Sequence, residues 1–132
     1  MTLPLVYITG PFRSATLLEV QHNVERARDV GLAVAQRTGG YPVIPHMMTS
    51  EFDKSMTDDF WLAGTMELLR RCDAVMLMST WELSSGARAE QAEAERRGIP
   101  VFDQLAELAL FVKGWKMATG IENAADITVE LS

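Results

Sequence analysis

The fold is decided by Leu3-Pro4-Leu5-Val6-Tyr7-Ile8-Thr9-Gly10-Pro11, an apolar run that ends abruptly at a glycine and a proline. A continuous apolar run closed by turn residues is typical of a strand that is buried in a parallel sheet. Residues 17–37 then change to helical spacing, with small and apolar residues on one face and charged residues on the other. Gly39-Gly40 ends this predicted helix. The start of the chain therefore predicts a strand followed by an amphipathic helix, the repeating unit of an α/β sheet.

The alternation of strand and helix continues along the chain. Residues 45–56 are expected to form a loop, and the tail 114–132 is weakly patterned, with 127–131 as a candidate edge strand. The other segments are predicted strands at 41–44, 73–79 and 101–102 and predicted helices at 57–71, 86–97 and 103–113. We expect one α/β domain over residues 1–132, a doubly wound parallel sheet in a flavodoxin-like or Rossmann-like arrangement of three α/β/α layers.

The composition argues against several classes of function. Of the 132 residues, 48% are hydrophobic, which is enough apolar material for one core, and the net charge is −6. A DNA or RNA binder is therefore not expected, because it would normally present a basic face. One cysteine and two scattered histidines fit neither a disulfide framework nor a metal site. No apolar run approaches the roughly 18 residues of a membrane span, and the start lacks a secretory signal, so we expect a cytoplasmic protein without a membrane partner.

The candidate site lies where the strands end. Ligands of open parallel sheets bind beyond the carboxyl ends of the strands, where the strand order reverses. In a flavodoxin-like order the first and third strands are neighbours at that point, so the loops at 10–13 and 80–86 and the strand exit at 45–47 should share one crevice. The candidates for ligand contacts in these segments are Gly10, Pro11, Phe12, Arg13, His46, Trp81, Ser84, Ser85 and Gly86.

Each of these candidates also has a simpler structural interpretation. Arg13 is suited to grip a phosphate, but a Gly-Pro turn after a strand is common. His46 either contacts a ligand or caps a loop, and Trp81 either stacks on a base or covers the end of the sheet. Trp61, Cys72 and the methionines, including Met47 and Met48, are expected to fill the core.

Glu90 is the candidate for chemistry at the crevice. The serines at 84–85 cap the following helix, and Glu90 lies about one turn inside it, with a side chain that leans back toward the crevice. We expect the helix dipole to favour its ionised form, and such a carboxylate suits attack on an electrophilic sugar carbon. By spacing alone, a solvated helix acid like Glu93 and Glu95 is the simpler interpretation.

Taken together, the motifs resemble the nucleoside 2-deoxyribosyltransferase superfamily, and above all its small members near the 2'-deoxynucleoside 5'-monophosphate N-glycosidases. The resemblance extends from Val6 to about Phe102. The matching motifs are Tyr7-Ile8-Thr9-Gly10-Pro11-Phe12-Arg13, Tyr41-Pro42-Val43-Ile44-Pro45-His46, Cys72-Asp73-Ala74-Val75-Met76-Leu77, Trp81, Ser84-Ser85-Gly86-Ala87-Arg88-Ala89-Glu90 and Gly98-Ile99-Pro100-Val101.

The resemblance implies a mechanism. Glu90 would be the nucleophile that attacks C1' of the sugar, expels the base and forms a glycosyl-enzyme ester. Water then gives hydrolysis, and a second base gives transfer. Six positions earlier, where the transferases carry an Asp that contacts the sugar, this chain has Ser84. The monophosphate hydrolases carry a Ser there that holds the 5'-phosphate, and a hydroxyl does not repel a phosphate as a carboxylate would.

One position departs from the family pattern. Thr65 stands eight positions before Asp73, where the family has an Asp near the leaving group. A threonine cannot act as a general acid at neutral pH. Four alternatives follow. Asp58 or Asp59 substitutes for the missing acid, a partner chain in a homodimer supplies it, catalysis is weakened, or the protein binds its ligand without cleaving it.

The sequence therefore predicts an N-glycosidase that hydrolyses a (deoxy)nucleoside 5'-monophosphate. Glu90 is the predicted nucleophile, and Asp59 is the second predicted catalytic residue. A deoxyribosyltransferase and a non-catalytic nucleotide-binding module are the alternatives. We expect no metal, no organic cofactor and no nucleic acid polymer as a partner, and a homodimer as the assembly.

Overall fold

A four-stranded parallel sheet forms the centre of the molecule. The computed structural model describes residues 2–48 and 55–119. The strands run in the order β2-β1-β3-β4 and are β1 (Leu5–Thr9), β2 (Tyr41–Val43), β3 (Ala74–Leu77) and β4 (Val101–Phe102). The register pairs Val6 with Ala74 and Thr9 with Leu77, so β1 and β3 end side by side. The expected neighbourhood of the first and third strands is confirmed.

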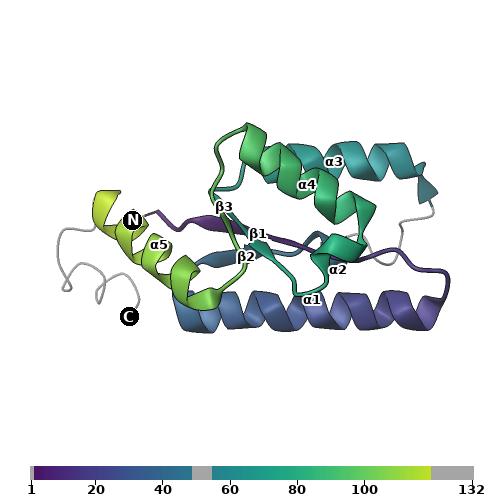
Figure 1. The fold of residues 1–132 in the computed structure, drawn as a ribbon, viewed down its shortest axis with the longest axis horizontal. Helices are drawn as coiled ribbons and strands as arrows, with labels where there is room; N and C mark the ends of the chain where they lie inside the picture. Colours follow the sequence, from purple (N-terminus) through teal and green to yellow (C-terminus); the bar gives the residue numbers. More distant parts are fainter. Residues whose placement is uncertain (1, 49–54, 120–132) are drawn as a thin grey trace.

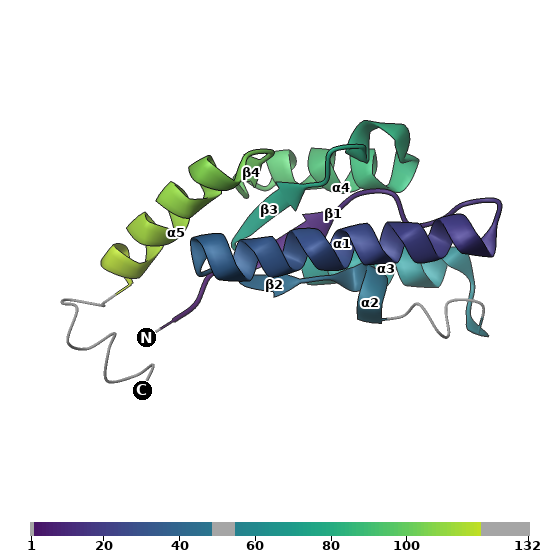
Figure 2. The same cartoon turned by 90° about the horizontal axis from the view of Figure 1, so that it is seen from below.

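Helices cover both faces of this sheet, which confirms the three-layer α/β fold. They are α1 (Leu17–Thr38), α2 (Pro45–Met48), α3 (Asp58–Arg70), α4 (Ser85–Arg96) and α5 (Leu105–Ala118), with a 3-10 turn, η2 (Trp81–Leu83). Figure 1 shows α3 and α4 together on one side of the sheet and α1 on the other. In Figure 2, which views the molecule from the α1 side, α1 lies in front of the strands, and α5 packs beside α1.

Strand β1 is mostly apolar because both of its faces are buried. Val6 and Ile8 belong to a core cluster shared with residues of α1 and α5, such as Val34 and Leu108. Tyr7 points to the other face, into a cluster that includes Leu69 of α3. Successive side chains of a strand alternate between the faces of the sheet, so a strand in the middle layer needs apolar residues throughout.

Side-chain caps set the starts of the longer helices. Thr16 accepts a hydrogen bond from the Glu19 N–H at the start of α1, and Thr57 caps α3 in the same way. The Ser84 hydroxyl accepts from the Ala87 N–H, 3.1 Å away, at the start of α4. The cap predicted at the serine pair is confirmed.

Several predicted boundaries were wrong. Residues 45–48, expected to be loop, form α2, and residues 114–118, expected to be a weakly patterned tail, complete α5. Gly114 weakened the helical signal there, whereas Phe111 and Trp115, one turn apart, have their ring centroids 6.2 Å apart and support the helix. Met47 and Met48 are about half exposed, not core residues. The candidate edge strand at 127–131 lies outside the described residues.

Length and apolar character together define a membrane-spanning helix. Within residues 2–48 and 55–119, no helix combines the two to the degree that crossing a membrane requires.

Candidate functional site

A cleft of about 400 Å³ opens where β1 and β3 end. The loop after β1, the start of α2, the first half of α3 and the junction of η2 with α4 all contribute to it. Of the residues predicted for the site, the structure brings into this cleft Gly10, Pro11, Phe12, Arg13, His46, Asp59, Ser84, Ser85, Gly86 and Glu90.

Glu90 is buried at this cleft, with 9% of its surface exposed. Its carboxylate accepts hydrogen bonds from the hydroxyl of Tyr7 and from that of Thr9, the latter at 2.7 Å. Both hydroxyls come from β1, 81 and 83 positions away in the sequence. The interpretation of Glu90 as a solvated helix acid is therefore wrong, because the carboxylate is held by the central strand of the sheet.

Burial controls the acidity of this pair. It raises the pKa of Glu90 above its ordinary value of 4.5, and hydrogen bonds from Tyr7, Thr9 and Thr65 offset part of that rise. The expectation that the helix dipole keeps Glu90 ionised thus missed the larger effect. Burial also raises the pKa of Tyr7 well above its ordinary 10.0, and the nearby Glu90 charge adds to it. The phenol therefore stays protonated and donates to Glu90.

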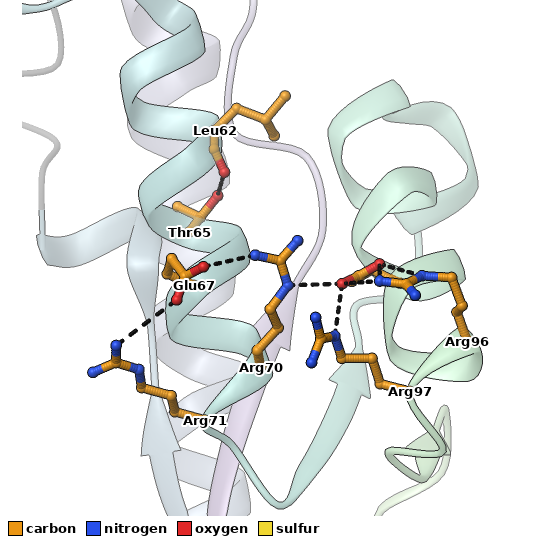
Figure 3. Close-up of polar contacts among 8 residues, drawn as sticks. Leu62, Thr65, Glu67, Arg70, Arg71, Arg96 and Arg97 are labelled. Carbon is orange, nitrogen blue, oxygen red and sulfur yellow. Dashed lines mark hydrogen bonds and ion pairs between the residues drawn. The ribbon is translucent and has the colours of Figure 1, made fainter.

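Thr65, the position that departs from the family pattern, faces Glu90 from α3. Its hydroxyl donates to the carbonyl oxygen of Leu62, 3.0 Å away (Figure 3). The same hydroxyl lies near Glu90, and a hydrogen bond from it lowers the pKa of that carboxyl group. Its single proton serves either the Leu62 carbonyl or Glu90, not both at once. The position where the resemblance places a carboxylate is thus occupied by a third hydroxyl group close to the buried acid.

His46 fixes the loop after β1. Its Nε2 lies 3.2 Å from the carbonyl oxygen of Gly10 and 3.0 Å from that of Pro11. Burial lowers the pKa of His46, so the ring is neutral near pH 7 and donates its Nε2 proton to these carbonyls. Its ring also packs edge to face on Phe12, with centroids 5.4 Å apart, and Asn23 donates to the Phe12 carbonyl at 3.1 Å. His46 therefore caps the loop as well as lining the cleft.

Gly10 allows this loop to approach the end of β3. A Cβ atom at this position would lie 2.4 Å from the sulfur of Met78 and 2.6 Å from its Cβ. These distances are too short for any side chain, so glycine is required where the two strand ends meet.

The rim of the cleft carries charges of both signs. The Arg13 guanidinium lies 2.9 Å from the carboxylate of Asp58, and both side chains are substantially exposed, at 49% and 77%. Asp59 lines the same rim. At the start of α4, the backbone N–H groups of Ser85 and Gly86 have no carbonyl partner within the helix, because no helical turn precedes them. The start of α4 therefore favours the binding of an anion.

The aromatic lining differs from the prediction. Trp81 does not line the cleft and instead packs on the core cluster that includes Tyr7. Trp61, expected in the core, lines the cleft, with its ring centroid 5.0 Å from that of Phe60. Tyr7, Leu62 and Leu83 also line it and were not predicted. One sequence signal could have placed α3 at the cleft. Its cleft-lining residues recur at helical spacing and so share one face of the helix: Asp58, Trp61, Leu62 and Thr65.

No group of three or more His, Cys, Asp or Glu side chains in the described ranges is arranged to hold a metal ion.

A comparison with protein families matches residues 4–104 to a domain of unknown function, DUF7768. The chain belongs to this family. The DUF7768 match covers the strands from β1 to β4 and every residue that lines the cleft. A comparison with curated proteins found no match.

Proposed function

We propose that the protein hydrolyses the N-glycosidic bond of a (deoxy)nucleoside 5'-monophosphate, with Glu90 as the nucleophile. The observation that carries the proposal is the buried Glu90 carboxylate, which lines a cleft of about 400 Å³ and is held by the hydroxyls of Tyr7 and Thr9. A cleft of this volume suits a small ligand of nucleotide size.

The reaction has two steps. The ionised Glu90 carboxylate attacks C1' of the sugar, the C1'–N bond breaks, and the base leaves with the bonding electron pair. Water then attacks C1' of the glycosyl-enzyme ester and releases the sugar phosphate and the free carboxylate. Tyr7 and Thr9 orient the two carboxylate oxygens, because each donates to a different one.

The departing base takes up a proton, and Asp59 is the residue that we propose as its donor. The Asp59 carboxylate then accepts a proton from the attacking water in the second step, so that both residues return to their starting state. Asp59 lines the cleft from the first turn of α3, the helix that also carries Thr65. The Thr65 hydroxyl is engaged with the Leu62 carbonyl and has no acidity near neutral pH. In this assignment the proton donor is a carboxyl group on the same helix as Thr65.

The phosphate and the base would bind at different parts of the cleft. The start of α4, with the hydroxyl of Ser85 and the backbone N–H groups of Ser85 and Gly86, suits a phosphate. The Arg13 guanidinium adds a charged donor. The rings of Phe12 and Trp61 offer aromatic surface for the base.

The test incubates the protein with each nucleoside 5'-monophosphate and with the matching nucleosides. Chromatography then measures the free base that is released. Glu90→Gln keeps the shape of the side chain and should lower the rate at least about a thousandfold. Glu95→Gln is the matched control, because Glu95 is an exposed acid on the same helix. Release that persists in Glu90→Gln would refute the assignment of the nucleophile. Adding a second base and finding a new nucleoside would identify transfer instead of hydrolysis.

A non-catalytic nucleotide-binding module is the second candidate, and Thr65 is the observation that favours it. A hydroxyl beside Glu90 supports binding of a sugar but not protonation of a leaving base. A rise in the melting temperature with a monophosphate, without base release during long incubation, would support the binding module over the hydrolase.

A further inference from the structure

We propose that Asp58 weakens the binding of phosphorylated ligands in the cleft, because its carboxylate pairs with the Arg13 guanidinium that a phosphate would bind. The inference rests on the proposed function in one respect, the use of Arg13 to bind the 5'-phosphate. In the free protein, Asp58 would thus act as an internal substitute for the anion.

The geometry joins two segments that line the cleft. Arg13 belongs to the loop after β1, and Asp58 is the first residue of α3. The contact of 2.9 Å is a direct ion pair, and both residues line the cleft. His46 and Asn23 hold the carbonyls of residues 10–12, so the backbone that leads into Arg13 is fixed. The guanidinium therefore meets an incoming phosphate at a defined place.

The ion pair is weak enough to be exchanged. Its two side chains are 49% and 77% exposed, and water screens an ion pair of this kind. A phosphate offers a planar guanidinium two acceptor oxygens and carries more charge than a carboxylate. The displaced Asp58 carboxylate returns to water beside the N-terminus of α3, where the helix dipole favours a negative charge.

The exchange discriminates between ligands. A neutral nucleoside leaves the pair intact and gains nothing from Arg13, whereas free phosphate has to break the pair with no other contacts to offset the loss. A nucleoside monophosphate breaks the pair and also binds through its sugar and base. Asp58 therefore lowers the affinity of the cleft for phosphate and for a nucleoside monophosphate by a similar factor, and it leaves the affinity for a nucleoside unchanged.

The test measures binding by titration calorimetry with three probes: inorganic phosphate, 2'-deoxyguanosine 5'-monophosphate and 2'-deoxyguanosine. All proteins carry Glu90→Gln so that the ligand is not consumed. Asp58→Asn should bind the two phosphorylated probes about 3- to 10-fold more tightly, with no change for the nucleoside. Asp59→Asn is the matched control: it removes the same charge from the next residue, which is not paired with Arg13, and should give a smaller gain.

A double-variant comparison separates the exchange from general electrostatics. With Arg13→Gln in place, Asp58→Asn should lose most of its effect on the phosphorylated probes. An unchanged effect in that background would overturn the proposal. So would an affinity for monophosphate that Asp58→Asn leaves unaltered, or the absence of any phosphate binding. The melting temperature of each variant checks the fold.

The outcome is separable from that of the proposed function, because base release is measured on the protein with Glu90 intact. Binding that depends on Arg13 and Asp58 as described, without base release, would refute the hydrolase and leave this inference standing. Base release together with an unaltered affinity in Asp58→Asn would refute this inference alone.

Discussion

The hydroxyl of Tyr7 connects the middle strand of the sheet to Glu90, and the pH dependence of the proposed reaction follows from that contact. Glu90 attacks only as a carboxylate, and burial raises its pKa above 4.5, so activity should rise with pH above that value. In Tyr7→Phe a hydrogen bond that lowers the pKa of Glu90 is lost. The acid limb of kcat/KM for base release should then move to higher pH. Thr9→Val should move it in the same direction, because the Thr9 hydroxyl also donates to Glu90.

Tyr41→Phe is the control for this prediction, because Tyr41 is 57% exposed and does not line the cleft. It should leave the pH profile unchanged. An acid limb at the same pH in Tyr7→Phe as in the parent protein would show that this hydroxyl does not tune Glu90.

Gly10 gives a second prediction at the scale of one residue. Because a Cβ atom would lie within 2.6 Å of Met78 Cβ, Gly10→Ala forces the loop or the end of β3 to move. We expect a loss of about 1–3 kcal/mol in the free energy of unfolding, measured by urea denaturation. Gly64→Ala is the control: apart from its chain neighbours and the nearby backbone of its own helix, nothing lies within 4 Å of the added Cβ, and this helical position should gain about 0.5–1 kcal/mol. Equal effects of the two substitutions would contradict the packing argument.

At the same scale, local sequence located Glu90 but not its surroundings. The serine pair predicted where α4 begins. Glu90 lies about one turn inside that helix, and its side chain was therefore expected near the crevice. Its contacts to Tyr7 and Thr9 join residues more than 80 positions apart, and no local pattern encodes them. The same limit explains Trp81, which packs on the core cluster that includes Tyr7, whereas the helical spacing of Trp61 with Asp58 and Thr65 was a local signal for its place at the cleft.

At the scale of elements, Glu93 connects α3 to α4. Its carboxylate accepts from Arg70 of α3 at 2.8 Å and from Arg96 and Arg97 at the end of α4 (Figure 3). These three guanidinium groups lower the pKa of Glu93 to about 2. Since the ordinary value is 4.5, the stabilisation is present above that pH and is lost as the pH falls toward 2.

Glu93→Gln should therefore lower the melting temperature at neutral pH, and the difference from the parent protein should shrink between pH 4.5 and 2. Scanning calorimetry at several pH values measures it. Glu95→Gln, which removes an exposed acid from the same helix, should show a smaller change at neutral pH. A difference for Glu93→Gln that is independent of pH would argue against the ion-pair origin.

Element boundaries were predictable where a side chain caps the helix. Thr57 and Ser84 are such caps, and α3 and α4 begin within a residue or two of the expected positions. The end of α5 was missed because Gly114 and the polar residues near it carry a weak signal, while the contact of Phe111 with Trp115 appears only in three dimensions.

At the scale of the whole molecule, the resemblance predicts a homodimer with the cleft near its interface. Leu62 and Leu83 line the cleft, and they are 45% and 82% exposed. Large exposed apolar side chains at the edge of a cleft are typical of a surface that a partner covers. We therefore expect a dimer in analytical ultracentrifugation and its dissociation in Leu83→Glu.

The control for this prediction is Leu110→Glu, which places the same charge on an exposed position of α5 that does not line the cleft. It should leave the dimer intact. A single-chain mass of the parent protein at every concentration would contradict the dimer, and equal dissociation by both variants would place the interface elsewhere.

The anchoring of the loop after β1 has a consequence for anyone who wishes to redesign the protein for bulkier compounds. Met78 leaves no room beneath Gly10, and His46 holds the neighbouring carbonyls in place. Additional volume therefore has to be created along α3 and η2, at Leu62 and Leu83. These side chains have no polar atoms, so shortening them leaves no hydrogen-bond partner unpaired. Trimming these two leucines would widen the entrance, but it would also remove apolar surface from the side where we expect the partner chain to pack.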